Sequence, residues 1–287
     1  MARWHALLAC PHCGSDLAEK RGSLVCAAGH SFDIARQGYV NLLPGGAEVG
    51  TADTLEMVGS RKAFFASGHY RSLVERVAAV TADAVSDVPG CIIDAGAGTG
   101  EYLAAVLEAT PGRVGLALDL SKHAARHAAR AHPDAGAVVC DVWGRLPVRD
   151  GVAAAVMCVF APRNAAETAR VLAPGGALVV VTPTSRHLSE IIGPLGMLTV
   201  DPDKGARLER TLGADFVRRR LEPLEYSATL SVDDMVSLAM MGPSAWHATP
   251  DRVRAEAERL GDGTDVSVSV EIGVWRVDRS SDVSDAL

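Results

Sequence analysis

Between residues 91 and 181, short segments that are apolar throughout alternate with segments of helical periodicity. Strands are expected at 91–94, 114–119, 137–140, 153–160 and 177–181, with helices between them at 101–108, 122–131 and 165–172. Strands that lack a polar face must be covered on both sides, and alternation with helices is typical of a parallel sheet. The sequence therefore predicts an α/β fold with helices on both faces of one sheet.

The segments that flank this alternation are more polar. Helical periodicity covers 61–85 with an interruption at Ser67–Gly68, and 46–60 is expected to be a polar, mobile linker. From 183 to about 220 the chain is polar and helical, which indicates an insertion. The remaining chain predicts a strand at 226–230, helices at 233–241 and 251–260, a strand at 266–277, and a disordered tail at 278–287.

Three cysteines and a histidine lie close together near the start of the chain, at Cys10, Cys13, Cys26 and His30. Each pair spans a short turn, so the four side chains can converge tetrahedrally on one Zn²⁺. A segment this short cannot bury a core of its own, and a metal supplies the missing folding free energy. Four protein ligands leave no open position, which indicates a structural site. Ordinary buried or redox cysteines explain the paired spacing less well.

Composition limits the class of protein. The 287 residues carry a net charge of −7, which argues against nucleic-acid binding by the whole surface but not by a local patch. No segment has the length of a membrane span, and the N-terminus does not resemble a signal peptide. Cys91, Cys140 and Cys158 lie in apolar segments and are expected in the core. We expect a cytoplasmic protein with no membrane contact.

A glycine-rich loop follows the first expected strand directly and opens a helix. It runs Asp94-Ala-Gly96-Ala-Gly98-Thr99-Gly100, and Asp119 ends the next strand. Closely spaced glycines let a backbone approach a ligand, and a carboxylate at the second strand can accept hydrogen bonds from both ribose hydroxyls. The spacing differs from the dinucleotide fingerprint. A nicotinamide dehydrogenase and a plain tight turn are the alternatives.

This pairing resembles the class I, Rossmann-like S-adenosylmethionine-dependent methyltransferases. The loop matches their first motif, with Gly96, Gly98, Thr99 and Gly100 placing the cofactor. Asp119 matches the ribose-binding acid, and Asp141, at the end of the third strand, matches the position near the adenine amino group. The segment 172–176 resembles another recurring element of that fold. The resemblance implies S-adenosyl-L-methionine as the methyl donor.

Over residues 8 to 277 the chain resembles the RlmA family, bacterial 23S ribosomal RNA (guanine-N1) methyltransferases. The cysteine cluster and four further segments carry the resemblance: 32–44, 61–70, 182–188 and 241–246. It looks closest to the actinomycete branch that gives tylosin-type macrolide resistance. The resemblance implies methylation of N1 of a guanine in the 23S rRNA hairpin loop at the peptide exit tunnel, with help from the zinc module in recognising RNA.

The resemblance also implies a domain division and site residues. Residues 1–45 would be the zinc module, 46–85 the linker and leading helices, and 86–277 the methyltransferase domain, with 183–245 as a substrate-recognition insertion. The family's zinc ligands match Cys10, Cys13, Cys26 and His30, and its cofactor contacts match Tyr70, Thr99, Gly100 and His187. The partner would be 23S rRNA, and a homodimer is expected.

The segment after the fourth strand, 158–163, should face the transferred methyl group. It lacks the signature of exocyclic amino-group methylation, and Cys158 has apolar neighbours that disfavour a reactive thiolate. Guanine N1 carries a proton that must leave, with His187, Asp141 or solvent as acceptor. Candidates for stacking RNA bases are Phe64, Phe65, Trp246 and 218–220, with ordinary core or a solvated helix face as the alternative, which is favoured for Phe64 and Phe65. A quinone or macrolide methyltransferase and a non-catalytic binding module are the competing functions.

Overall fold

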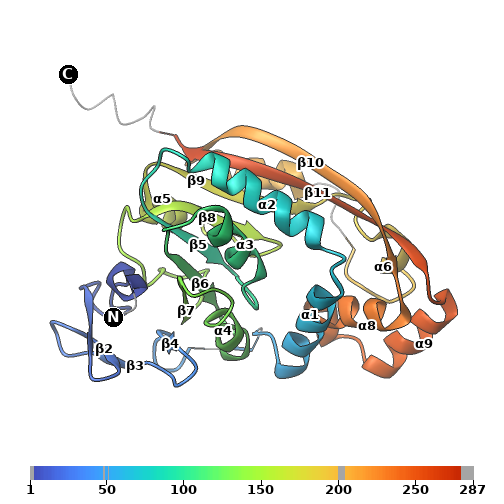
Figure 1. Cartoon of the computed structure of the whole chain (residues 1–287), viewed down its shortest axis with the longest axis horizontal. Coiled ribbons are helices and arrows are strands. Elements are labelled where there is room, and N and C mark those ends of the chain that lie inside the picture. The colour runs from blue at the N-terminus through green and yellow to red at the C-terminus, as the bar shows by residue number, and fades with distance from the viewer. Residues whose placement is uncertain (1–2, 48, 51, 200–203, 279–287) are drawn as a thin grey trace.

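The computed structural model describes residues 3–47, 49–50, 52–199 and 204–278, and shows an eight-stranded sheet with a small three-stranded sheet at one end (Figure 1). The main sheet has the order β10-β11-β9-β8-β5-β6-β7-β4. Its strands are β4 (Tyr39–Asn41), β5 (Cys91–Ala95), β6 (Gly115–Asp119), β7 (Ala135–Val139), β8 (Ala153–Val159), β9 (Leu172–Pro183), β10 (Phe216–Leu230) and β11 (Thr264–Val277). The small sheet has β1 (Leu17–Lys20), β2 (Ser23–Cys26) and β3 (Ser31–Asp33).

The described helices follow the predicted alternation in the centre of the chain. They are α1 (Leu55–Ser67), α2 (Arg71–Ala84), α3 (Glu101–Ala109), α4 (Lys122–Ala128), α5 (Ala165–Val171), α6 (Ser189–Ile192), α7 (Lys204–Leu212), α8 (Val232–Met240) and α9 (Pro250–Leu260), with 3-10 turns η1 (Arg3–Leu7) and η2 (Pro243–Trp246). Strands β4 to β9 pair in parallel, which confirms the α/β fold. No helix among the described residues is both long and apolar enough to cross a membrane.

The start of the first long helix differs from the sequence-based expectation, whereas its end does not. The interruption predicted at Ser67–Gly68 is present, because Gly68 takes the left-handed conformation that ends α1. However, α1 begins at Leu55 instead of residue 61, since the Thr54 hydroxyl caps it by accepting the Met57 N–H. Beyond Asp278, the predicted disordered tail lies outside the described residues.

The predicted insertion contains a strand that the sequence pattern did not indicate. Strand β10 begins at Phe216, ten residues before the predicted start, and pairs antiparallel with β11 along its length. Most of its residues are at least partly exposed because it forms the outer edge of the sheet. An edge strand of this kind is polar enough to resemble a helix-and-loop segment.

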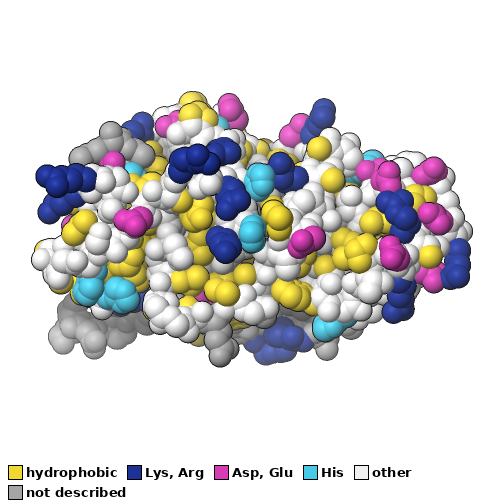
Figure 2. All heavy atoms as spheres, turned by 90° about the horizontal axis from the view of Figure 1, so that it is seen from below, with side chains coloured by type: hydrophobic (Ala, Val, Ile, Leu, Met, Phe, Trp, Pro, Cys, Tyr) yellow, Lys and Arg dark blue, Asp and Glu magenta, His cyan; other side chains and the backbone are white. Residues whose placement is uncertain are grey.

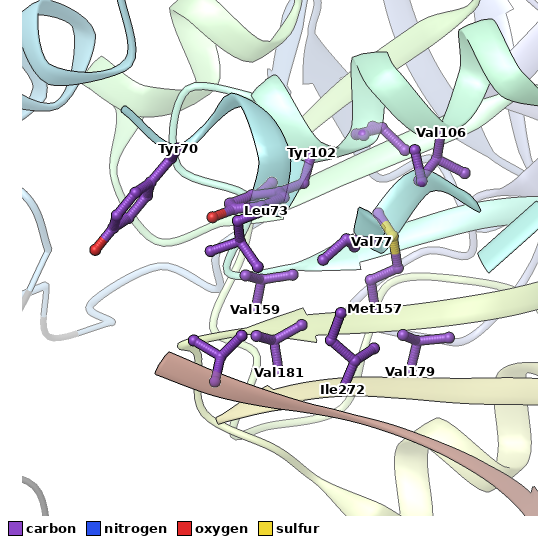
Figure 3. Packing of buried hydrophobic residues seen from close by; sticks show 14 of the residues in the cluster. Tyr70, Leu73, Val77, Tyr102, Val106, Met157, Val159, Val179, Val181 and Ile272 are labelled. Carbon is purple, nitrogen blue, oxygen red and sulfur yellow. The ribbon is translucent and has the colours of Figure 1, made fainter. Parts of the chain in front are cut away.

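The core beside α2 and α3 holds the centre of the sheet in place (Figure 3). Met157 on β8 and Ile272 on β11 are completely buried there, together with Leu73 of α2 and Val106 of α3. Close packing of such buried side chains fixes the strands against the helices. The carboxyl ends of β5, β6 and β8 consequently form a rigid edge on which a site can be built.

The N-terminal module is joined to the main domain by a continuous apolar layer. Leu8 and Leu24 of the module belong to the same buried cluster as Val138 of β7. Strand β4 pairs in parallel with β7 and is therefore a strand of the main sheet. The segment 1–45 that the sequence assigned to the zinc module thus includes part of the main sheet.

Gly136→Ala is expected to disrupt this joint. A Cβ at Gly136 would lie 2.1 Å from Cδ2 of Trp4, whose ring is buried. Because both groups are confined, the substitution should cost about 1–3 kcal/mol of unfolding free energy. Urea unfolding followed by tryptophan fluorescence measures the change. Gly144→Ala is the matched control, since the nearest atom to its added Cβ is 3.7 Å away; equal stability of the two variants would contradict the prediction.

Candidate active site and zinc centre

The four predicted zinc ligands converge in the structure. Their ligand atoms lie within 4.8 Å of one another. The Sγ atoms of Cys13 and Cys26 are 3.7 Å apart, and Nδ1 of His30 is 3.3 Å from Sγ of Cys26 and 3.5 Å from Sγ of Cys10. A tetrahedron with Zn–S bonds of about 2.3 Å has S–S edges of about 3.8 Å, so the ligand set fits Zn²⁺. With four ligands from the protein, the centre is structural.

A cavity of about 450 Å³ lies where β5, β6 and β8 end. Gly96 and Gly98 form part of its wall and both have positive φ angles. A Cβ at Gly96 would lie 2.6 Å from Cβ of Ala161, and one at Gly98 would lie 3.2 Å from Cδ of Arg61. Only glycine fits here without displacing neighbours. The loop therefore presents bare backbone to a ligand, as a cofactor loop requires.

Asp94 supplies a buried carboxyl group to this cavity. The residue is 1% exposed, and its Oδ2 has no hydrogen-bond partner. Burial, with the nearby charges of Asp119 and Glu101, raises the pKa of Asp94 to about 8. A buried carboxylate is stable only beside a cation or donors. The ammonium group of the methionine moiety of S-adenosylmethionine is a cation of the required kind.

Asp119 and Asp141 lie along the same cavity. Asp119 accepts N–H bonds from Gly98 and Ser121, each 2.8 Å long. Burial raises the pKa of Asp119 to about 6, although these two bonds oppose the change. Each carboxylate oxygen keeps a further lone pair, which a ribose hydroxyl can use. Asp141 is exposed at the rim and accepts the Trp143 N–H at 2.9 Å.

Thr99 and Gly100 are not among the described residues that line this cavity. The buried Thr99 hydroxyl donates to the Glu101 carboxylate at 2.6 Å. Gly100 has a φ of 94°, and a Cβ there would come within 3.0 Å of Cα of Ala128. In this structure both residues directly precede α3, and Gly100 lets that helix pack against α4.

Tyr70 and His187 meet beside the cavity. Tyr70 Oη lies 3.2 Å from His187 Nε2, and the Ser269 N–H donates to His187 Nδ1, also at 3.2 Å. Since Nδ1 accepts, a neutral His187 carries its proton on Nε2 and donates it to Tyr70. Burial raises the pKa of Tyr70 far above its ordinary value. Tyr70 lines the cofactor cavity, whereas His187 lines a neighbouring one.

That neighbouring cavity, of about 760 Å³, is here called the acceptor cavity. It shares with the cofactor cavity the residues Arg61, Tyr70, Trp143, Phe160, Pro162, Met241 and Pro243. Trp143 is 65% exposed, and Phe160 is 40% exposed with a φ of 52°. A bulky residue held at positive φ is strained backbone of the kind found at functional sites. The Phe160 ring lies nearly parallel to His187, with ring centres 5.6 Å apart.

Part of the site comes from the predicted linker, which the sequence did not indicate. Asp53 lines the cofactor cavity, and its Oδ2 accepts from Nη2 of Arg61 at 2.7 Å. The same Nη2 lies 2.8 Å from the carbonyl oxygen of Met241. These contacts join residues far apart in the chain. Arg61 belongs to the segment 61–70 that carried the family resemblance, but its partners could not be read from that segment.

The other predicted residues have mixed positions. Phe64 is buried core, while Phe65 lines the cofactor cavity and Trp246 is 46% exposed. On β10, Arg218 pairs with Glu209, and Arg220 pairs with Asp83 and Glu222. The cysteines predicted in the core, Cys91, Cys140 and Cys158, are all buried. Burial raises the pKa of Cys158 to about 12, which disfavours a reactive thiolate at this position.

Figure 2 shows a group of Lys and Arg side chains left of the centre of this face, among scattered acidic side chains. Burial and the charges of Lys62, Arg126 and Arg130 lower the pKa of His127, which places these side chains close together. Ser121, the N-cap of α4, donates its N–H to Asp119. The exposed Lys122 begins the same helix, three residues after Asp119 of the cofactor cavity. The four residues Lys62, Lys122, Arg126 and Arg130 are here called the basic surface.

The sheet order, the glycine loop and the acidic residues at the strand ends define a class I S-adenosylmethionine-dependent methyltransferase that carries an N-terminal zinc ribbon. The family model described as "RlmA, N-terminal" matches residues 8–47, and the one described as "Methyltransferase domain" matches residues 92–176. The chain belongs to the RlmA family of 23S rRNA (guanine-N1)-methyltransferases.

Three relatives support this assignment. A protein of Micromonospora griseorubida is 48% identical over 94% of this chain and 97% of its own. The 23S rRNA (guanine(748)-N(1))-methyltransferase of Streptomyces fradiae is 45% identical over 94% of this chain and 96% of its own. The YxjB protein of Bacillus subtilis is 32% identical over 94% of this chain and 97% of its own. The resemblance found in the sequence is confirmed.

Proposed function

We propose that the chain transfers a methyl group from S-adenosylmethionine to N1 of a guanine in 23S rRNA. The observation that carries the proposal is the shared wall between two cavities: one has the cofactor loop and Asp94, and the other has exposed aromatic residues. RNA enzymes read unpaired bases by stacking them on aromatic and arginine planes. The name of the Streptomyces fradiae relative, 45% identical to this chain, supports guanine N1 as the acceptor atom.

One set of residues would bind the cofactor, and another would position the target guanine. Asp94 would hold the ammonium group of the cofactor, Asp119 its ribose hydroxyls and Asp141 the adenine amino group, since all three line the same cavity. Trp143 and Phe160, on the shared wall, would hold the flipped guanine by its faces. The sulfonium supplies an already electrophilic methyl group, so holding N1 in line with it at near-attack distance provides much of the rate.

RNA binding would use the zinc ribbon and the basic surface. Lys62, Lys122, Arg126 and Arg130 can contact phosphates, which reconciles RNA binding with a net charge of −7. The target we propose is a guanine in the 23S hairpin loop at the peptide exit tunnel, and the consequence is tylosin-type macrolide resistance. The proposed homodimer is checked by mass measurement in solution.

The test is methyl transfer from labelled S-adenosylmethionine to unmethylated 23S rRNA and to its isolated exit-tunnel hairpin. Because N1 methylation blocks Watson–Crick pairing, primer extension should stop at one hairpin guanine. Phe160→Ala should bind cofactor normally but transfer methyl groups slowly. Cofactor binding with no transfer to RNA would overturn the proposal and favour a small-molecule acceptor. A tylosin-sensitive host that expresses the chain should tolerate more of the drug.

A further inference from the structure

Methylation at guanine N1 raises a chemical problem, because N1 carries a proton at neutral pH. When that proton leaves, negative charge develops on O6 of the base as an enolate. An enzyme can lower the barrier with a base at N1 or with a positive donor at O6. The side chains around the acceptor cavity distinguish these two possibilities.

The described wall of the acceptor cavity contains no carboxylate, lysine or cysteine. Its one imidazole, His187, has both nitrogens engaged: Nδ1 accepts from the Ser269 N–H, and Nε2 lies against Tyr70 Oη. Tyr70 is a weak base candidate since burial disfavours its phenolate. Asp141 lines the cofactor cavity but is missing from the described acceptor wall. The sequence-based candidates His187 and Asp141 are therefore poorly placed to take the N1 proton.

Arginine is the charged residue that this wall does contain, at Arg61, Arg163 and Arg207. Arg61 is paired with Asp53, and Arg207 belongs to α7 in the insertion. Arg163 directly follows 160–162, the segment of the β8 end that lines the cofactor cavity. Among the described residues it forms no salt bridge, and the hydrogen bond that its Nη1 donates to the Ala161 carbonyl oxygen is long, at 3.4 Å.

The half-buried position of Arg163 adds to its suitability. Burial lowers the pKa of the guanidinium because the cation loses solvation without gaining a carboxylate partner. A group in this condition gains most when negative charge develops beside it. Its N–H donors also match O6 of guanine and would oppose the amino group that adenine carries at the same position.

We infer that Arg163 is a catalytic and specificity-determining residue, which donates hydrogen bonds to O6 of the target guanine while the N1 proton leaves to solvent. The inference rests on the proposed function. The N1 proton passes to water or hydroxide, and the negative charge is shared by N1 and O6. The N1 electron pair then bonds the methyl carbon, the S–CH₃ bond breaks with its pair returning to sulfur, and O6 becomes a carbonyl again. Arg163 stays protonated throughout.

The experiment measures single-turnover methyl transfer to the exit-tunnel hairpin, with saturating RNA and cofactor, between about pH 6 and about pH 9. Arg163→Ala should be slower by about 100- to 1000-fold near pH 7, as when one oxyanion donor is removed. Its rate should keep rising with pH beyond the point where the unmodified enzyme levels off. Added guanidinium should restore part of the rate, and Arg163→Lys should be intermediate.

Two controls separate chemistry from folding. S-adenosylhomocysteine should bind Arg163→Ala and Arg163→Lys as it binds the unmodified enzyme, and Arg254→Ala, which removes an exposed arginine of α9, should leave the rate unchanged. A rate for Arg163→Ala within about threefold of normal would overturn the inference, as would a slow rate with an unshifted pH profile and no rescue. Failure of the unmodified enzyme to methylate the hairpin would overturn the proposed function, and the inference with it.

Discussion

Asp94→Asn should weaken the binding of S-adenosylhomocysteine by about 30- to 1000-fold, the loss expected when one partner of a buried charge pair is removed. The carboxyl group lies on the cavity wall with Oδ2 unpartnered, so the ammonium group of the ligand can be its counter-charge. An asparagine keeps the shape but loses the charge. Isothermal titration calorimetry measures the affinity without turnover.

The pH dependence of the same affinity tests whether the charge of the Asp94 carboxylate is responsible for binding. With a pKa of about 8, Asp94 is mostly protonated at neutral pH in the free protein. A cationic ligand needs the ionised form, so binding should release a proton, and affinity should rise by up to about tenfold per pH unit until about pH 8. The Asp94→Asn protein should show neither effect. Equal pH dependence in both proteins would contradict the assignment.

The unfolding free energy of the ligand-free protein provides an independent check, because Asp94→Asn should increase it while weakening ligand binding. A carboxyl whose folded pKa lies above its unfolded value destabilises the free protein as pH rises through that range. Asp94→Asn should therefore be the more stable protein at pH 8 although it binds ligand less well. Asp87→Asn, at an exposed acid, is the matched control and should change neither quantity.

The parts of the site that the sequence predicted are those encoded by neighbouring residues. Asp94 and the glycines follow one strand directly, so a short motif specifies the loop that the structure shows. Cys10, Cys13, Cys26 and His30 lie within one small ribbon, and their spacing alone predicts convergence. Helix α3 and strand β8 were predicted within one residue because apolar periodicity records burial directly.

The parts that were missed depend on contacts between distant segments. The hydrogen bonds that Arg61 donates to Asp53 and to the Met241 carbonyl oxygen become visible only when α1, the linker and the end of α8 are brought together. Only the second half of β10 was predicted, because residues 218–223 at the edge of the sheet are mostly charged and exposed. Gly100 also lies close to α4, a packing role that no local pattern predicts, while its contact with the cofactor stays a prediction.

Removal of zinc is expected to separate the RNA-binding role of the ribbon from the cofactor site. Cys13→Ala is the preferred variant, because Cys13 is exposed while Cys10 and Cys26 are buried, so its loss leaves no cavity. Structural zinc contributes about 10–16 kcal/mol of apparent binding free energy in small modules, so without it β1–β3 should unfold locally. Methyl transfer to the hairpin should then fall more than about 100-fold.

Binding of S-adenosylhomocysteine to the Cys13→Ala protein should change less than about threefold, because Asp94, Asp119 and the glycine loop are held by β5, β6 and α3. Hydrogen exchange should show faster exchange in β1–β3 and normal protection in β5–β8. His12→Ala, at an exposed neighbour that stacks on Phe32, should keep zinc and activity. A parallel loss of cofactor affinity would instead mean that the apolar layer from Leu8 to Val138 makes ribbon and sheet one cooperative unit.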